Sequence, residues 1–431
     1  MNSNRPLTVL LCLLSFVLAS CGHSSSNNAS LRIMNAIPDA PSISVQLGTN
    51  PPLITGMLFQ QLTQYMSVSG GSQDFMVSAN GGQSFAINET LNMGSGSYTY
   101  VVYGPIVSAA GFLINENNIQ TPNSGEFNFR VINVAAGIGP VDVYLTPLGT
   151  DINATSPTVS DVGLGAISQF VSPNAGTLEM RATATGTKNI IYDTAVQTFT
   201  NGDSYEAVVF TKGSARLVSM ALLDENSTGT GQVLDNLLAD FKVVNASTAG
   251  TALNVLVSNV VVLSNIPYQG VSNYVNTPAG STTFSVQATA TPGANLLTLV
   301  ATLDSATDTS LVFSGPPGGL IPLVLNDNNL PPPALNARVR FVNASPGLGP
   351  VDVYVNFSQT TAALAENSAS LYFNETADGT IGTAYEFDFN IAGTTTPVLK
   401  MPGVTIIAGH TYTVYVIGPS NAPQGVVSQD T

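Results

Sequence analysis

The chain has 431 residues, of which only 9% are charged, and its 26 acidic and 11 basic residues give a net charge of −15. This balance, without any run of Lys or Arg, argues against nucleic acid and anionic lipid surfaces as partners, because both attract clustered positive charge. The length exceeds one ordinary hydrophobic core and suits three or four domains of about 100 residues.

The amino-terminal segment has the pattern of an export signal. Arg5 supplies a positive charge, residues 7–18 are an apolar stretch too short to span a bilayer, and Leu18-Ala-Ser-Cys21 follows. This tetrapeptide resembles the lipobox of bacterial lipoproteins, which implies cleavage after residue 20 and lipidation of Cys21. The alternative is ordinary secretion with Cys21 unmodified. Acyl chains on one cysteine would hold the protein on a membrane without a transmembrane helix.

The cysteine count restricts the chemistry of the mature chain. Cys12 lies in the signal and Cys21 carries lipid, so no thiol remains for a disulfide, a zinc site or a nucleophile. Gly22 stands where an Asp commonly retains lipoproteins in the inner membrane, which favours the outer membrane if the cell has one. Residues 21–30 are polar and predict a flexible tether that includes His23.

A repeated string organises the remainder. Gly137-Ile-Gly-Pro-Val-Asp-Val-Tyr-Leu145 recurs as Gly347-Leu-Gly-Pro-Val-Asp-Val-Tyr-Val355, and each copy follows a short apolar run with a cation and an Asn. Related runs occur twice more. The four marker residues are spaced by 98, 112 and 98 residues, which indicates four units in an A-B-A-B order: Asn35, Asn133, Asn245 and Asn343.

In chain order, each unit predicts short strands separated by turns. Residues 31–120 alternate apolar and polar positions at Ile43, Val45 and Leu47, a period of two, and close on an aromatic strand at 98–103. Residues 115–125 have little apolar content and predict a linker. The next unit, 121–230, repeats this order.

The carboxyl-terminal half follows the same plan. One unit covers 231–333 and ends in residues 326–333, whose three consecutive prolines predict a stiff spacer. The last unit covers 334–431. Many Val and Tyr residues between Gly, Asn and Pro turns favour an all-β protein, a tandem array of four small antiparallel, Ig-like β-sandwiches. Tyrosines that open three of the closing strands are typical of that fold: Tyr98, Tyr205 and Tyr412.

These motifs support a family resemblance. The opening Arg-Val-x-Asn, the Pro-Val-Asp-Val-Tyr string and the late Ala-Gly-x-x-Tyr-Thr-Val strand resemble the domain of unknown function 4397 family, found in exported bacterial proteins, often in tandem and with lipoprotein signals. The match is close in the second and fourth units and degenerate in the others. It implies a β-rich, sandwich-like module and assigns no catalytic residue.

The aspartates of the repeated string are candidate functional groups. In Val-Asp-Val-Tyr the valines share one strand face, so Asp142, Asp352, Tyr144 and Tyr354 should face solvent. An antiparallel hairpin around the Gly-Pro turn would place each Asp opposite the marker Asn of its own unit, as a cross-strand hydrogen bond that fixes register. A catalytic pair needs a second convergent group, which one Asp per unit does not supply.

Other chemistry has weaker signals. Oxygen-rich segments such as Asp304-Ser-Ala-Thr-Asp308 lack the spacing of calcium loops, so we expect no metal and no cofactor. The mature chain has only His23 and His410 and no Gly-x-Ser-x-Gly elbow, which gives no catalytic triad. The tyrosines beside the aspartates could form a face for a sugar or peptide.

We therefore expect a non-enzymatic, lipid-anchored array of β-modules on the cell envelope, acting in adhesion, scaffolding or ligand capture. Its partners would be the membrane, through the lipid, and an envelope protein or glycan; the oligomeric state is open. Two alternatives stay open: an envelope glycan hydrolase with carboxylates between modules, and a purely structural spacer.

Overall fold

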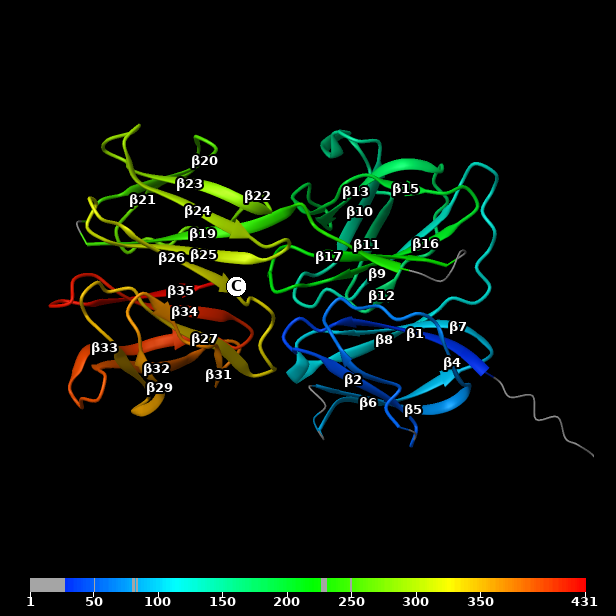
Figure 1. Cartoon of the computed structure of the whole chain (residues 1–431), viewed down its shortest axis with the longest axis horizontal. Coiled ribbons are helices and arrows are strands. Elements are labelled where there is room, and N and C mark those ends of the chain that lie inside the picture. The colour runs from blue at the N-terminus through cyan, green and yellow to red at the C-terminus, as the bar shows by residue number, and fades with distance from the viewer. Residues whose placement is uncertain (1–27, 50, 80–81, 83, 226–230, 249) are drawn as a thin grey trace, which may run out of the picture.

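The computed structural model describes residues 28–49, 51–79, 82, 84–225, 231–248 and 250–431. The export signal and Cys21 lie outside the described residues. Strands dominate and form eight sheets (Figure 1). The only helical segments in the described part are the 3-10 turns η1 (Ile106–Ser108) and η2 (Ile152–Ala154). No described helix has the length and apolar character needed to cross a bilayer.

The sheets lie face to face in pairs, and each pair encloses an apolar cluster. The first sandwich is built from two four-stranded sheets. The strand order in one sheet is β4 (Met66–Ser69), β1 (Asn28–Ala36), β7 (Gly96–Tyr103), β8 (Ala110–Asn115). The strand order in the other is β3 (Ile54–Met57), β2 (Ile43–Leu47), β5 (Gly71–Ala79), β6 (Phe85–Met93).

The second sandwich has two five-stranded sheets. One is β12 (Ala166–Ile167), β9 (Asn128–Asn133), β16 (Ser204–Phe210), β17 (Ser219–Asp224), β18 (Gly231–Leu234). The other is β11 (Val159–Val162), β10 (Val141–Thr146), β13 (Gly176–Ala184), β14 (Ile190–Asp193), with β15 (Gln197–Phe199) also on β13.

The third sandwich returns to two four-stranded sheets. The strand order in one sheet is β22 (Val275–Pro278), β19 (Leu238–Ser247), β25 (Asp308–Gly315), β26 (Ile321–Asp327). The strand order in the other is β21 (Val260–Ile266), β20 (Leu253–Val257), β23 (Gly280–Ala288), β24 (Asn295–Leu303).

The fourth sandwich completes the chain. Its sheets are β30 (Ser368–Ala369), β27 (Asn336–Asn343), β34 (Thr411–Ile417), β35 (Gln424–Gln429), with β31 (Phe373–Thr376) also on β27, and β29 (Ser358–Leu364), β28 (Val351–Val355), β32 (Thr383–Ile391), β33 (Pro397–Ile406).

The prediction of an all-β protein built from sandwiches is confirmed. One pairing in each sandwich departs from an antiparallel pattern, because the opening strand runs parallel to the closing strand: β1 with β7, β9 with β16, β19 with β25 and β27 with β34. Every other named strand pairing in the described chain is antiparallel.

The predicted hairpin around the Gly-Pro turn is wrong. β9 and β10 belong to opposite sheets of the second sandwich, and so do β27 and β28 of the fourth. Gly137 and Gly139 adopt φ of 88° and 83° in the turn that carries the chain across the core, a left-handed conformation that glycine tolerates without a Cβ clash. The repeated Gly-x-Gly-Pro string therefore marks a crossing between sheets.

The opening strands are buried on both faces. On β9, Phe129 and Val131 point into the core of the second sandwich, whereas Ile132 packs with residues of the first sandwich. β19 and β27 behave alike, with Val244 of the third sandwich against Val342 of the fourth. Two apolar clusters thus join the sandwiches into a first–second pair and a third–fourth pair.

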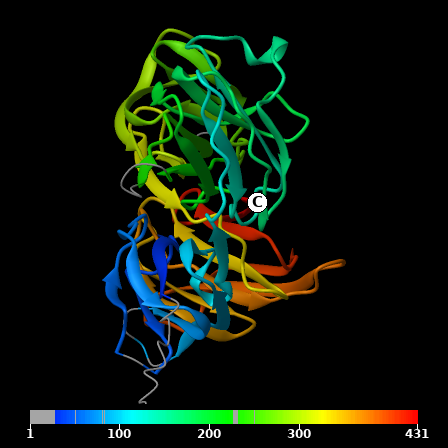
Figure 2. The ribbon, with the colours of Figure 1, turned by 90° about the vertical axis from the view of Figure 1, so that its right-hand side faces the viewer.

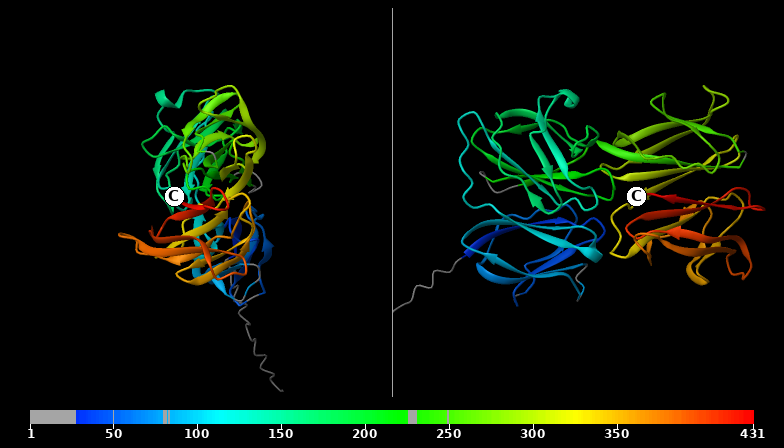
Figure 3. Two further views of the ribbon diagram at one scale, coloured as in Figure 1. Left: turned by 90° about the vertical axis from the view of Figure 1, so that its left-hand side faces the viewer. Right: turned by 180° about the vertical axis from the view of Figure 1, so that it is seen from behind.

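The pairs stand side by side. Figure 1 shows the third and fourth sandwiches stacked on one side and the second and first stacked on the other, and the views in Figures 2 and 3 agree. The stretch 326–333 is not an extended spacer in this arrangement, because Leu330 is only 1% exposed and Asn329 Nδ2 donates to Asp308 at 2.7 Å.

Candidate functional site

The two predicted aspartates hold turns in place. Asp142 accepts hydrogen bonds from the backbone N–H of Asp161 at 2.8 Å and of Gly186 at 3.1 Å. Asp352 accepts from the N–H of Ala363 and of Gly393, both at 2.8 Å, and these bonds hold the pKa of Asp352 below its ordinary value. Both residues are buried, so the predicted solvent exposure is wrong. The predicted pairing with Asn133 and Asn343 is also wrong, because each Asp and its marker Asn lie on opposite sheets.

The marker asparagines form side-chain hydrogen bonds that link the two sheets of each sandwich. Asn133 Nδ2 donates to the carbonyls of Gly139 at 3.0 Å and Val162 at 2.8 Å, and its Oδ1 accepts from the N–H of Ala135. Because Val162 lies on the opposite sheet, one side chain fixes the crossing turn and ties the sheets together. Asn245 and Asn343 make the same three bonds. Asn35 makes two of them, to the carbonyl of Met57 on the opposite sheet and from the N–H of Ile37.

The two tyrosines of the repeated string do not form a shared face. Tyr144 is 1% exposed, and Lys188 covers it, with Nζ 2.9 Å from the Tyr144 hydroxyl. Tyr354 is half-buried and borders a hollow of about 320 Å³ with Asp388 and Lys400. The expected exposure of Tyr144 is therefore wrong, and the hollow at Tyr354 has no counterpart formed by an exposed Tyr144.

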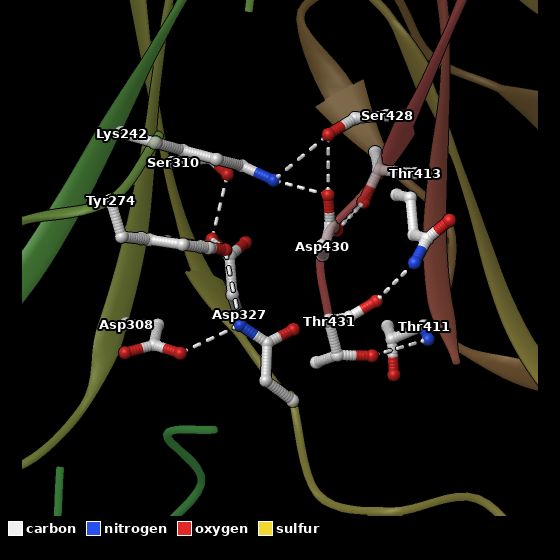
Figure 4. A network of polar contacts seen from close by, with 12 residues as sticks. Lys242, Tyr274, Asp308, Ser310, Asp327, Thr411, Thr413, Ser428, Asp430 and Thr431 are labelled. Atoms are coloured by element: carbon white, nitrogen blue, oxygen red, sulfur yellow. Dashed lines mark hydrogen bonds and ion pairs between the residues drawn. The ribbon is translucent and has the colours of Figure 1, made fainter. Parts of the chain in front are cut away.

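Buried charged clusters lie where the sandwiches pair. In the third–fourth pair, Lys242 of the third sandwich bonds Asp430 of the fourth (Figure 4). Arg340 of the fourth sandwich bonds Asp327 of the third at 2.6 Å. The hydroxyls of Ser310 and Tyr274 donate to Asp327 at 2.7 and 2.6 Å. Each sandwich thus supplies a cation for an acid of its partner.

The first–second pair holds an analogous cluster with an extra acid. Arg32 Nη2 lies 3.0 Å from Glu116 and 2.5 Å from Glu225, and the Tyr65 hydroxyl contacts both carboxylates. Glu206 pairs with Arg130 and is fully buried. Glu206 lies opposite Arg130 on the parallel closing strand, a register position occupied in the other sandwiches by hydroxyl residues: Thr99, Ser310 and Thr413.

The surplus charge changes the protonation of this cluster. Burial, followed by the charge of Glu225, raises the pKa of Glu206 to about 8. Burial and the charge of Glu116 raise the pKa of Glu225 to about 7. The two arginines therefore balance two carboxylates, and the third carboxyl group retains a proton near neutral pH.

The three carboxylates of this cluster do not form a metal site. Oxygens of Glu116, Glu206 and Glu225 lie within 4.8 Å of one another. However, Arg32 and the Tyr65 hydroxyl already occupy oxygens of Glu116 and Glu225, and only Oε2 of Glu206 lacks a hydrogen-bond partner. A divalent ion would lie beside guanidinium groups, so this donor set fits a proton better than a metal. With side chains at most 3% exposed, these carboxylates also lack the open cleft that glycan hydrolysis requires.

A cavity lies between the second and third sandwiches. Its volume is about 690 Å³, within the range of small-molecule sites, which favour domain junctions. Strand β14 with the turn before it and residues 215–217 supply most of the lining, and Leu238 and Asn276 come from the third sandwich.

Sequence reasoning missed the acids of the clusters. Glu116 and Glu225 fall in stretches with the composition of linkers, and Asp327 lies in the predicted spacer. Their cations were visible, three residues before each marker Asn. The available signal was one acid at the end of the strand that follows each closing strand, namely β8, β17, β26 and β35: Glu116, Glu225, Asp327 and Asp430.

Comparison with known proteins gives one family and two distant structures. The family model "Domain of unknown function (DUF4397)" matches residues 29–144, 239–354 and 337–431, more than half of the chain. No curated protein matches significantly. Among solved structures, the CBMbc module (family CBM26) of Eubacterium rectale Amy13K, in complex with maltoheptaose, has 11% identity and a TM-score of 0.16 over 44% of this chain and 95% of that one. The Bacillus anthracis TIE protein has 8% identity and a TM-score of 0.15 over 91% and 75%.

Proposed function

The chain belongs to the DUF4397 family, and from that premise we propose that it is a non-enzymatic, lipid-anchored envelope protein that holds a rigid body of β-sandwiches for ligand capture. The observation that carries the proposal is the pairing of sandwiches through opening strands buried on both faces. In a flexible string of separate modules, these apolar strand faces would be exposed to water. Fixed pairs instead keep the loops and junctions at constant positions, which is what a binding platform needs.

The acidic groups support a binding role over a hydrolytic one. Asp142 and Asp352 accept hydrogen bonds from backbone N–H groups. The carboxylates between the sandwiches form ion pairs with buried cations. A carboxyl group that acts on a substrate must contact it, and these groups face protein partners. Their roles in turns and interfaces account for their positions.

The anchor follows from the lipobox-like Leu18-Ala-Ser-Cys21 and the short polar stretch after it. Lipid on Cys21 would place the sandwiches close to a membrane surface, and Gly22 favours the outer membrane. The acidic body would be repelled by anionic headgroups, so only the tether would approach the bilayer.

Membrane fractionation of cells expressing the full chain, with mass spectrometry of the mature amino terminus, tests the anchor. We expect an acylated Cys21 and a membrane-bound protein that Cys21→Ala releases or leaves unprocessed. A mature amino terminus without acyl chains, in a protein still on the membrane, would contradict the proposal. The variant Cys12→Ala, altered within the signal, is the control and should be acylated normally.

A further inference from the structure

The hollow at Tyr354 lies on the outer face of a sheet of the fourth sandwich. Val353 and Val355 of β28 pack in the core, so Tyr354 between them points away from it. Tyr354 is the cross-strand neighbour of Asp388 on β32, which is in turn the neighbour of Lys400 on β33. These three side chains form one row across the sheet, and all three line the hollow. Its volume of about 320 Å³ is at the lower end of the range for small-molecule sites.

Phe357 also lines this hollow and lies in a strained turn. Asn356 and Phe357 are the two residues of the tight turn between β28 and β29, with φ of 45° and 69°. Gly and Asn are preferred in such turns, because a bulky side chain is strained in the left-handed region. The corresponding turn of the third sandwich has Ser258 and Asn259, with φ of 49° and 64°.

The strain at Phe357 is not offset by burial in a core, because this side chain is 73% exposed. The turn is nevertheless fixed in position. The N–H of Asn356 donates to the carbonyl of Glu386 on β32, and the N–H of Glu386 donates to Asn356 Oδ1, both at 2.9 Å. An aromatic ring is thus held in solvent beside the hollow at a cost in stability, which is typical of a residue kept for contact with a ligand.

The equivalent row is covered in the second sandwich. Tyr144 has the place of Tyr354 in the repeated string, and its neighbour on β13 is Arg181, as Asp388 is the neighbour of Tyr354 on β32. Lys188 Nζ lies 4.8 Å from the centroid of the Tyr144 ring and donates to its hydroxyl. In contrast, no described residue forms a hydrogen bond with the Tyr354 hydroxyl, so that group keeps both its donor and its acceptor for a ligand.

The hollow also has acceptors that lack donors. Oδ1 of Asp388 and Oδ1 of Asn390 are buried without a hydrogen-bond partner, whereas Asp388 Oδ2 accepts from Lys400 at 3.2 Å and Asn390 Nδ2 donates to the Thr394 carbonyl at 3.3 Å. A buried acceptor without a donor is costly, and a bound hydroxyl group can supply the donor. Lys400 is shared by Asp388 and Glu386, so the hollow offers hydrogen-bond partners rather than an unpaired positive charge.

We propose that this hollow binds a neutral oligosaccharide, with the C–H face of one pyranose ring on Phe357. The hydroxyls of that ring bond Tyr354, Asp388 and Asn390, after a rotation of the last two side chains that turns each free oxygen toward the ligand. The aromatic ring supplies apolar contact area, and sugar hydroxyls can both donate and accept. This inference rests on the proposed ligand-capture function and names its ligand class.

Isothermal titration calorimetry of the full chain carrying Cys21→Ala, with cellotetraose and tetraglycine as probes, tests the site. Tetraglycine has donors and acceptors but no ring face, so we expect cellotetraose to bind and tetraglycine not to bind. Phe357→Asn should weaken cellotetraose binding about ten-fold or more, because it removes the stacking surface. Tyr354→Phe keeps the ring and removes the hydroxyl, and should weaken binding by about three-fold or more.

Leu371→Asn is the matched control, because Leu371 is 90% exposed in the same sandwich, between β30 and β31 of the other sheet. It should leave the affinity for cellotetraose unchanged. No binding of cellotetraose, equal binding of tetraglycine, or equal affinities of Phe357→Asn and wild type would overturn the assignment.

Urea unfolding separates a binding role of Phe357 from a structural one. Asn occupies the same turn position in the third sandwich, so Phe357→Asn should leave the unfolding midpoint unchanged or raise it. A lower midpoint would show that Phe357 stabilises the fold and would overturn the proposal as well. Because the chain used lacks the lipidation site, failure here leaves the membrane anchor standing, and failure of the anchor leaves this site standing.

Discussion

At the scale of single residues, Glu206 is the main difference between the charged clusters of the two sandwich pairs. The third–fourth pair balances Lys242 and Arg340 with two aspartates, whereas the first–second pair places three carboxylates against two arginines. A buried charge without a partner is costly, so the surplus is relieved by a proton. The charged groups that act on Glu206 are Glu225 and Arg130 of its own sandwich and Glu116 of the first sandwich.

This surplus predicts a pH-dependent stability. The raised pKa of Glu206, about 8, means that the folded chain binds the proton more tightly than the unfolded chain, so the unfolding free energy falls as pH rises from about 4.5 to about 8. The slope is at most about 1.4 kcal/mol per pH unit for this group. Urea unfolding at several pH values should show a shallower slope for Glu206→Gln.

Glu126→Gln is the matched control, because Glu126 lies in the same sandwich and its carboxylate accepts from the side chain of the exposed Asn123. It should keep the wild-type slope. Glu225, with a raised pKa of about 7, contributes in the same direction and leaves part of the slope in the Glu206 variant. Identical slopes for Glu206→Gln and wild type would show that Glu206 is ionised throughout the range.

At the scale of strands and turns, much could be predicted from the sequence. Period-two alternation located strands such as β2, and the short apolar runs that end in a marker Asn located the related units, because both signals are local. The role of Gly137-Ile-Gly-Pro140 could not be predicted from the local sequence. The same glycines suit a hairpin turn within one sheet and a turn that crosses between two sheets. Glu225, Asp327 and Asp430 were missed because each binds a cation on another sandwich, at separations up to 193 residues. Glu116 was missed because its partner Arg32 lies 84 residues earlier in the chain.

The Asp352 turn clamp gives a prediction at this scale. Asp352→Ala leaves the N–H groups of Ala363 and Gly393 without their acceptor, and Ala363 has φ of 47°, a strained conformation that the bond supports. We expect a loss of about 1–3 kcal/mol in unfolding free energy, measured by urea titration. Asp304→Ala, an exposed position in a turn, should change it by less than about 0.5 kcal/mol. Equal losses of unfolding free energy in Asp352→Ala and Asp304→Ala would show that the Asp352 hydrogen bonds do not stabilise these turns.

At the scale of the whole molecule, the apolar clusters divide the chain into halves. Every described cluster lies within residues 29–234 or within residues 239–427, and the halves meet through polar contacts and the junction cavity. Interfaces of this kind inside one chain are weaker than shared cores.

We therefore expect residues 236–431 to fold alone, with a cooperative thermal transition close to that of the same half in the full chain. Residues 236–333 alone should aggregate or unfold, because Val244 and Val312 lose their apolar partners and Lys242 loses Asp430. Calorimetry and analytical ultracentrifugation of both fragments measure this. A stable, monomeric single sandwich would show that pairing is dispensable.

The reciprocal exchange of cations and acids in the third–fourth pair has an evolutionary consequence. Two copies of one face that contact each other through the same residues form an isologous association, the geometry of a two-fold homodimer. The third–fourth half of this protein thus has the arrangement of a two-fold homodimer within one chain. Any stand-alone relative with a single sandwich and an apolar, cation-bearing opening strand must either self-associate through that strand or replace its outward residues with polar ones.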